Sequence, residues 1–386
     1  MIRSFFYLSS ISLEIIARRV FISVINDLVT DQRVHKLAFS LSERGMEVVC
    51  IGRKFRKSPP VSSVAFRVRR MRFLINRGPV FYACFNLRLF LLHLFSARPS
   101  LIIANDLDTL LACYLAARIR KIPLVYDSHE YFTQVPELIN RERTRDFWLF
   151  LEGFLLRRIK HAITVSSAIA EKYQEKYGLG FTLVRNVPFR LDAHTRMKAH
   201  PGKEEHRIIY QGSLNIGRGL ELLITSMQFM NDTRLILAGT GDIDHQLRQL
   251  ANDLDIAGKV EFMGRILPGE LIPLTCSCDL GVSLEEDMGL NYRYALPNKI
   301  FDYIQCRIPV LCSDLPEMAQ LVTSYGVGMV VKKRDPEILA AQMAEMLEKG
   351  RQGCWQDALE RSADDLCWEK EVQQYLLVME NSMKDI

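Results

Sequence analysis

Short apolar runs alternate with amphipathic segments along most of the chain. Residues 20–25 form an apolar run that predicts a buried strand, and a polar loop follows it. Val34, Leu37 and Leu41 then recur at helical spacing, and residues 47–51 predict the next strand. Since a strand, a helix and a strand in this order usually form a parallel unit, the pattern predicts an α/β fold.

The same alternation occurs twice, on either side of a polar stretch without periodicity. The first set of further strands is predicted at residues 100–104, 123–127, 162–165 and 181–185. The second set is predicted at residues 207–211, 234–238, 259–262, 279–283, 309–313 and 328–331. We therefore expect two doubly wound, Rossmann-like domains in series that face a shared cleft, with ligands beyond the carboxyl ends of the strands.

Boundaries follow from where the alternation starts and stops. The predicted units are a leader of uncertain structure (1–19), an N-terminal domain (20–190), a linker (191–206), a C-terminal domain (207–365) and a last helix (366–386) that packs back toward the N-terminal domain. The leader is interrupted by Glu14 and has no small-residue cleavage site after it. We therefore do not expect it to be a signal peptide.

Composition is typical of a soluble globular protein: 386 residues, 48% hydrophobic and 25% charged. This excludes a disordered chain, a collagen and a disulfide scaffold. The nine cysteines are odd in number and contain no CxxC pair, so a zinc site is not expected and a reducing cytoplasm fits best.

Charge is distributed unevenly although the net charge is only +5. Residues 1–200 hold 32 basic and 16 acidic residues, whereas residues 201–386 hold 18 and 29.

Residues 48–105 contain no Asp or Glu and eleven Lys and Arg, and they include the apolar run 80–95. Arg88 and His93 interrupt this run, which is too short for a spanning helix. The pattern predicts peripheral attachment to an anionic membrane on its cytoplasmic face; the alternative is a buried helix beside a solvated basic loop. Nucleic acid is not expected, because no recognition helix or stacking platform is evident.

Two strand-to-helix loops of the C-terminal half suit an anionic ligand. Residues 211–219 carry three glycines and Arg218, and backbone N–H groups at a helix start bind anions. Asn298 is a natural N-cap, and Lys299 would conflict with the positive end of its helix unless an anion were bound there. Asp302, one turn further on, suits sugar hydroxyls. The alternative for these residues is an ordinary turn with solvated charges.

His129 follows the strand predicted at 123–127 and would enter the cleft as a proton or hydrogen-bond partner, or be structural. Three acids at 285–287 also end a strand, where mutual repulsion disfavours a purely structural role.

Taken together, these segments resemble a family 4 (group 1) glycosyltransferase with the GT-B fold. The resemblance rests on the order and spacing of NDLVTDQRVHKLA, YDSHEYF, QGSLNIGRGLELL, LAGTGD, VEFMGRI and PNKIFDYIQCRIPVLCSDLPEM. It implies a nucleotide-sugar donor bound by the C-terminal domain and a glycan or lipid-linked acceptor bound by the N-terminal domain. It further implies transfer that retains the anomeric configuration, with no metal ion and no cofactor besides the donor itself.

Residue roles are implied by the same resemblance. In the donor loop that begins at Gly212, Arg218 neutralises the diphosphate, and Asp302 holds the ribose. Arg265 and Ile266 border the base.

His129 lies near the transferred sugar, and Glu286 is the best match for the acid beside that sugar, with Glu285 nearly as good. Two positions depart from the family pattern: Tyr294 stands at the usual place of that acid, and Ser213 at that of an arginine, whose charge Lys299 would supply. Asn298 is assigned to the same donor site.

Other functions stay open at this point. A GT-B sugar-nucleotide epimerase or a non-catalytic sugar-nucleotide-binding relative would keep the nucleotide site without needing an acceptor. An NAD oxidoreductase is disfavoured, because residues 239–241 lack the third glycine of the dinucleotide fingerprint. The three Asp-x-Asp sequences are not expected to bind a catalytic metal.

Overall fold

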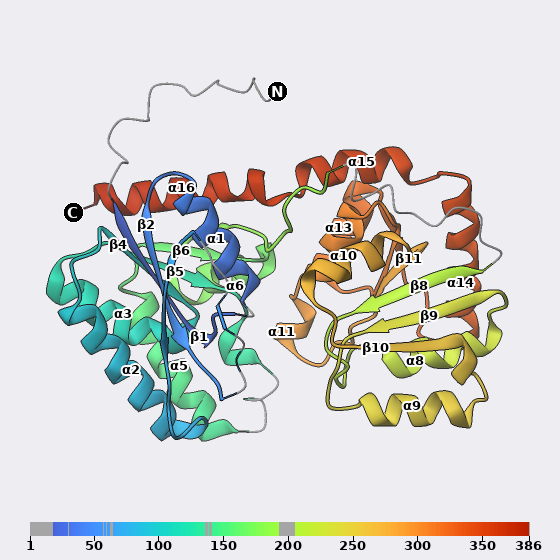
Figure 1. Ribbon diagram of the computed structural model, residues 1–386, viewed down its shortest axis with the longest axis horizontal. Coiled ribbons are helices and arrows are strands. Elements are labelled where there is room, and N and C mark those ends of the chain that lie inside the picture. The colour runs from blue at the N-terminus through green and yellow to red at the C-terminus, as the bar shows by residue number, and fades with distance from the viewer. Residues whose placement is uncertain are drawn as a thin grey trace.

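The computed structural model describes residues 18–29, 31–56, 58, 60–61, 65–135, 138, 141–192 and 205–385. Most of the predicted leader and linker therefore lies outside the described residues. The two predicted α/β units are seen as two parallel sheets side by side (Figure 1).

The N-terminal sheet has seven parallel strands in the order β3-β2-β1-β4-β5-β6-β7. Its central strands β1 and β4 are buried on both faces, as expected for a sheet covered by helices on each side. The strands are β1 (Arg19–Asp27), β2 (Glu47–Arg53), β3 (Arg67–Met71), β4 (Leu101–Asn105), β5 (Leu124–Ser128), β6 (His161–Thr164) and β7 (Phe181–Leu183).

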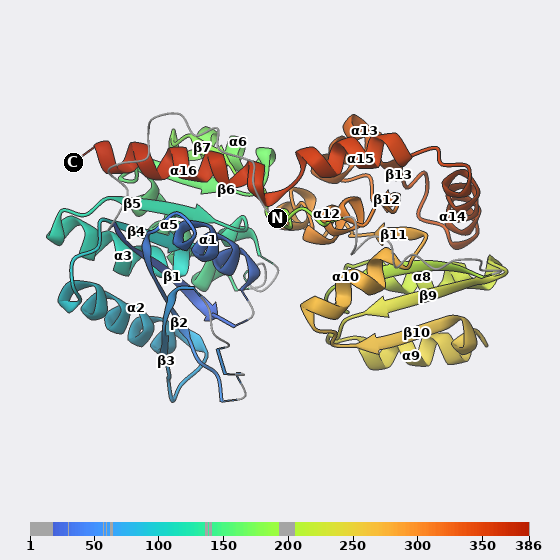
Figure 2. The ribbon, with the colours of Figure 1, turned by 45° about the horizontal axis from the view of Figure 1, so that its top comes forward.

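Alternate residues of these strands feed two separate cores. Even-numbered residues of β1 pack toward α1 and α16, whereas Phe21 packs toward α2, α3, α5 and α6. Turning the molecule shows α16 and α2 on opposite sides of the sheet (Figure 2). These helices are α1 (Gln32–Ser42), α2 (Gly78–Phe95), α3 (Leu107–Arg120), α5 (Glu142–Leu156), α6 (Ser167–Tyr177) and α16 (Trp368–Lys384), with a 3-10 turn η1 (Phe132–Gln134).

The C-terminal sheet has six parallel strands in the order β10-β9-β8-β11-β12-β13. Its strands are β8 (His206–Gln211), β9 (Thr233–Ala238), β10 (Val260–Gly264), β11 (Leu280–Ser283), β12 (Val310–Cys312) and β13 (Gly328–Val330). One face carries α8 (Leu220–Ser226), α9 (Asp244–Asp253) and α14 (Pro336–Arg351). The other carries α10 (Pro268–Cys276), α12 (Asn298–Gln305), α13 (Pro316–Tyr325) and α15 (Gln356–Asp365). The short α11 (Leu290–Arg293) precedes α12, and η2 (Met227–Phe229) and η3 (Ala257–Lys259) are 3-10 turns.

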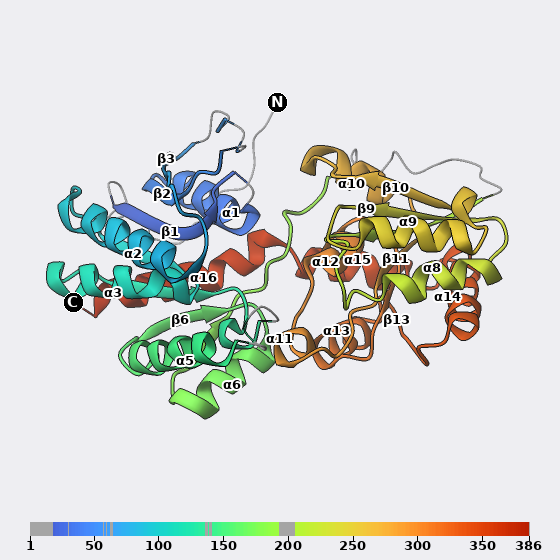
Figure 3. The same cartoon turned by 90° about the horizontal axis from the view of Figure 1, so that it is seen from below.

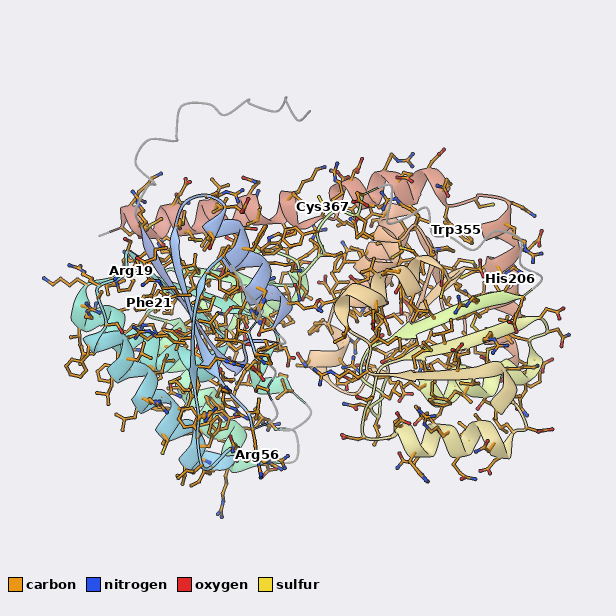
Figure 4. The ribbon with its side chains drawn as sticks, in the orientation of Figure 1. Arg19, Phe21, Arg56, His206, Trp355 and Cys367 are labelled. Atoms are coloured by element: carbon orange, nitrogen blue, oxygen red, sulfur yellow. The ribbon has the colours of Figure 1, made fainter. Side chains whose placement is uncertain are left out.

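The last helix, α16, leaves the C-terminal domain and lies along the N-terminal one. The chain crosses at Cys367, which Figure 4 places above the junction of the two domains. Trp368 is fully buried, and its Nε1 donates to Ser40 Oγ of α1 at 2.9 Å. The end of the chain is thus part of the N-terminal core.

Two further contacts join the domains where α11 and α13 face the N-terminal half (Figure 3). Glu317 of α13 accepts a hydrogen bond from Ser167 Oγ at 2.8 Å, at the start of α6. Asn291 of α11 accepts one from the Tyr131 backbone N–H at 3.0 Å. The domains therefore also touch through α11 and α13.

Helix α2 is the only one among the described residues that is long and apolar enough, by length and composition, to cross a membrane, and 22% of it is buried. Two polar side chains tie it to the domain. Asn86 Nδ2 donates to the Asp108 carbonyl at 2.8 Å, and the buried His93 bonds Ser23 Oγ of β1 at 2.8 Å. In this structure α2 is accordingly one of the helices that cover the sheet.

Candidate functional site

A cleft of about 1070 Å³ opens between the two domains. Its walls come from the loops that follow the strands, as parallel sheets favour. It brings together six of the residues predicted from the sequence: His129, Gly212, Arg218, Asn298, Lys299 and Asp302.

His129 lies just beyond β5 and is held from three directions. Its Nε2 is 3.1 Å from Asn105 Oδ1 and 3.4 Å from Asp127 Oδ2, and its Nδ1 is 3.5 Å from Asp106 Oδ2. Burial alone would lower the pKa of His129, but the charges of Asp106 and Asp127 outweigh it and raise the pKa to about 9. At neutral pH the side chain is therefore a fixed imidazolium, which donates protons to hydrogen bonds and cannot act as a base.

Asp127 anchors this histidine from behind. Arg33 grips it in a bidentate pair, with Nε to Oδ2 at 3.0 Å and Nη2 to Oδ1 at 2.9 Å, and Tyr375 of α16 donates to Oδ2 at 3.1 Å. Burial favours the neutral acid, but Arg33 and His129 hold the pKa of Asp127 well below its usual range.

Sequence analysis did not find Arg33, Asp127 or Tyr375. The available signal was Arg33 itself, one helical turn before the core residue Leu37, on the face of α1 that had to be buried.

Two further acids, Asp106 and Asp108, line the same wall. Burial raises the pKa of Asp106 above its usual value, and it raises that of Asp108 much further, with help from the charge on Asp106. Among the described residues, Asp108 Oδ1 has no hydrogen-bond partner. This buried carboxyl therefore lines the cleft with one oxygen that no described residue bonds.

On the opposite wall, the glycine loop packs tightly against its neighbour. Gly239 has φ +156°, and a Cβ at that position would lie 1.8 Å from the carbonyl oxygen of Gly212. Gly212 itself has φ +136° and lies beside Lys299. The two glycines let the backbones of the loops after β8 and β9 approach each other at the cleft.

Arg218 and Lys299 share one buried carboxylate, Glu285. Lys299 Nζ is 2.8 Å and Arg218 Nη1 3.4 Å from Glu285 Oε1, and Ser283 Oγ donates to Oε2 at 2.7 Å. Burial would raise the pKa of Glu285, but the two cations and the hydrogen bonds outweigh it and lower the pKa. Both cations also lie over rings, Lys299 over Tyr210 and Arg218 over Tyr292. The group carries one positive charge in excess.

Asp302 is buried one turn into α12. Its Oδ2 accepts from Gln211 Nε2 at 2.6 Å, and Gln211 in turn accepts from Thr275 Oγ1 at 2.8 Å. Burial raises the pKa of Asp302 to about 7. Gln211 is a further polar residue of the site that sequence analysis did not assign.

Asn298 lies in the cleft, but its predicted role as an N-cap is wrong. The N-cap of α12 is Pro297, no side chain caps the helix, and Asn298 is its first helical residue. Its side chain is consequently available to the cleft.

Three predicted residues lie outside the residues that line the cleft. The carboxylate of Glu286, whose side chain is 43% exposed, lies 3.3 Å from Arg334. The alternative acid, Glu285, is also absent from the cleft lining, because it is buried against Arg218 and Lys299. Arg265 is exposed in the loop after β10, and Ile266 packs against the core. The roles assigned to these residues stay predictions.

Within the part of the chain that the structure describes, no three His, Cys, Asp or Glu side chains gather as metal ligands would. All nine cysteines are free thiols.

Comparison with known proteins yields two family matches. Residues 31–188 match the model of Glycosyltransferase Family 4, and residues 205–349 match that of Glycosyl transferases group 1. The chain is 30% identical over 150 residues to a chitobiosyldiphosphodolichol beta-mannosyltransferase of Debaryomyces hansenii. That match covers 35% of this chain and 30% of the relative, so the chain spans less than a third of the length of that protein.

Solved structures show the same fold over nearly the whole chain. The sucrose-phosphate synthase of Thermosynechococcus elongatus has a TM-score of 0.77 at 17% identity, covering 96% of this chain and 100% of its own. Anabaena HepE in complex with UDP has a TM-score of 0.64 at 15% identity, covering 94% and 99%.

Proposed function

The chain belongs to the family 4, group 1 glycosyltransferases of the GT-B fold, and we propose that it moves a sugar from a nucleotide-diphosphate donor to a glycan or lipid-linked acceptor. The donor would bind the C-terminal wall and the acceptor the N-terminal wall of the cleft. HepE, whose structure contains UDP, and the yeast relative, whose name specifies a chitobiosyldiphosphodolichol substrate, support this proposal.

One observation carries the proposal: Arg218 and Lys299 meet at a single buried carboxylate beside two loops that open helices. Two cations with one counter-charge leave a positive site on a wall of the cleft. A diphosphate supplies the missing negative charge, and the N-terminus of α12 adds its own attraction for anions.

The chemistry follows from this charge balance. As the bond between the sugar and the diphosphate breaks, negative charge builds on the departing phosphate. Arg218 and Lys299 are already oriented by Glu285, so they stabilise that charge without reorganising. His129 lines the opposite wall of the cleft, near the place of the sugar, and contact between the domains helps to exclude water.

Donor binding is tested with a panel of UDP, GDP and dTDP nucleotides and their sugars, read by thermal stabilisation and calorimetry. Arg218→Ala should weaken the best ligand by about 10- to 100-fold, the scale of a charged hydrogen bond. Arg293→Ala is the matched control, because Arg293 is an arginine of the same domain but pairs with Asp287 outside the cleft lining. Unchanged affinity in both Arg218→Ala and Asp302→Ala would refute this donor site.

We also propose that transfer retains the anomeric configuration and needs no metal ion, as the motif resemblance implies. Turnover should then be the same with and without EDTA. Loss of turnover in EDTA that manganese or magnesium restores would contradict metal independence. Comparison of the anomeric configurations of donor and product by NMR tests retention.

A GT-B epimerase is the second candidate, because it would use the same donor wall. The two are distinguished by incubating the donor without an acceptor: an epimerase produces an isomeric nucleotide sugar, whereas a transferase leaves the donor intact or slowly hydrolyses it.

We further propose that the protein docks on an anionic membrane at its cytoplasmic face. Nine large apolar side chains are exposed on three helices that cover the same face of the N-terminal sheet. We call them the apolar face: Val80, Leu87, Leu91 and Phe95 of α2, Leu115 and Ile119 of α3, and Phe147, Phe150 and Phe154 of α5. The adjoining stretch without acids, residues 48–105, supplies cations that suit anionic headgroups.

Flotation with vesicles of neutral or anionic lipid tests the docking. The double variant Leu87→Gln/Phe150→Gln should reduce recovery with anionic vesicles, since it removes apolar contact. Leu377→Gln is the control, because Leu377 is also exposed but lies on α16, across the sheet. Equal recovery with both lipids, or no dependence on salt, would argue against an electrostatic dock.

A further inference from the structure

The basic side chains that line the cleft differ in whether they form an ion pair. There are five: Arg33, Arg53, His129, Arg218 and Lys299. Arg33 and His129 pair with Asp127, and Arg218 and Lys299 pair with Glu285. Arg53 forms no ion pair with any described residue, and its Nε is buried without a hydrogen bond to any of them. A guanidinium without a carboxylate partner, in a cleft whose other basic side chains each pair with an acid, is a ready site for an anion.

Arg53 is held in place by rings rather than by acids. Its guanidinium lies 4.0 Å from the ring centre of Phe55 and 4.4 Å from that of Phe81. Stacking of this kind orients the guanidinium and leaves its N–H groups unsatisfied at the edges. Asp108, on the same wall, offers its unused buried oxygen in addition.

An aromatic path leads from this position to the outer surface. Phe81 contacts Tyr82, and Tyr82 and Phe132, both in the cleft lining, lie 5.2 and 5.0 Å from Trp148. Trp148 in turn contacts Phe147, at 5.6 Å, and Phe147 is exposed as part of the apolar face. Tyr82, Phe132 and Trp148 thus give the cleft an aromatic lining that a hydrocarbon chain can cover, on the side of the domain that carries the apolar face.

We propose that Arg53 and Asp108, together with Tyr82, Phe132 and Trp148, form an acceptor subsite for the phosphate and the first part of the hydrocarbon chain of a lipid-phosphate acceptor. Arg53 binds phosphate oxygens, the carboxyl of Asp108 donates to one of them when it is protonated, and the rings cover the chain. The proposal rests on glycosyl transfer as the function of the cleft, and it states which chemistry the acceptor carries.

The binding test uses dodecyl phosphate below its micelle concentration, with dodecanol, inorganic phosphate and glucose 1-phosphate as partial probes. The wild-type protein should bind dodecyl phosphate at least tenfold more tightly than any of the three. Arg53→Ala should reduce that affinity about tenfold, to the level of dodecanol, and Phe132→Ala should weaken dodecyl phosphate but leave inorganic phosphate unchanged.

Matched controls are Arg88→Ala, which removes another ring-stacked arginine outside the cleft lining, and Phe229→Ala, which removes an exposed ring of η2 in the C-terminal domain. Urea unfolding verifies that each variant keeps its fold. Equal losses in Arg53→Ala and Arg88→Ala would overturn the subsite. Tighter binding of glucose 1-phosphate than of dodecyl phosphate would overturn its lipid character.

Nucleoside diphosphate binding is measured on the same variants. If it persists while dodecyl phosphate does not bind, the acceptor subsite is wrong and the donor site stands. If it is absent in the wild-type protein as well, the proposed function itself fails.

Discussion

The N-terminal wall of the cleft places two carboxylates around one cation, Asp106 and Asp127 around His129, whereas the C-terminal wall places two cations around one carboxylate. The first arrangement is fastened deep inside its domain, since Arg33 and Tyr375 hold Asp127. The second is nearer to solvent, with Arg218 partly exposed.

This difference separates two tasks. A buried network with all its charges matched keeps a donor group in a fixed position. A group with one positive charge in excess attracts an anion and gains from binding it. The comparison therefore predicts that substitutions in the N-terminal wall mainly reduce stability, whereas substitutions in the C-terminal wall mainly change anion binding.

The largest effect is expected from Asp127→Ala. It leaves Arg33, whose side chain is only 3% exposed, without its bidentate partner, and breaking a buried pair typically costs about 3–5 kcal/mol. Urea unfolding measures the loss. Asp385→Ala, which removes an exposed partner of Lys160, is the control and should leave the free energy of unfolding close to that of wild type. Equal losses of unfolding free energy in the two variants would show that the Asp127 network does not stabilise the N-terminal wall.

The next effect is a dependence of stability on pH. Because the pKa of His129 rises from about 6.5 in the unfolded chain to about 9 in the fold, protonation favours the folded state. This contribution, about 3–4 kcal/mol, is complete below pH 6.5 and is lost as the pH rises through 9. Chemical denaturation from pH 6 to 10 measures it, with His129→Gln as the comparison. The same slope in both proteins would contradict a protonated His129.

Much of the fold was predictable because local patterns encode it. Apolar runs and helical spacing marked every strand of both sheets except β3. That strand contains Arg67, Arg69 and Arg70, pairs only with β2 at the edge of the sheet, and so shows no apolar alternation.

The site was predictable in part for a similar reason. His129, Arg218, Lys299 and Asp302 follow strands or open helices, and the carboxyl ends of parallel strands converge. The support behind them was not predictable, because Arg33 is 94 residues and Tyr375 is 248 residues away from Asp127 in the chain. Only the packing of α1 and α16 brings these three together.

A third prediction concerns Glu285, the counter-charge of the C-terminal wall. Glu285→Gln keeps the bond to Ser283 but leaves Lys299 and Arg218 without a carboxylate. We expect a stability loss of about 1–2 kcal/mol together with tighter binding of nucleoside diphosphate, because the ligand no longer competes with a fixed anion. Calorimetry measures the change in nucleotide affinity, and urea unfolding measures the change in stability. Weaker nucleotide binding in this variant would mean that Glu285 orients the cations more than it competes with the donor.

The smallest effect is expected from the neighbouring residue. Consecutive residues at a strand end point in opposite directions, so a sequence pattern cannot decide between Glu285 and Glu286, although their surroundings differ completely. Glu286 forms a partly exposed pair with Arg334, and such pairs contribute about 0–1 kcal/mol. Glu286→Gln should therefore leave both stability and nucleotide affinity within that margin, and transfer to an added acceptor should persist. If the same variant instead binds nucleotide normally but loses transfer, Glu286 reaches the sugar once the donor is bound, and the acid that the motif resemblance implied is the right one.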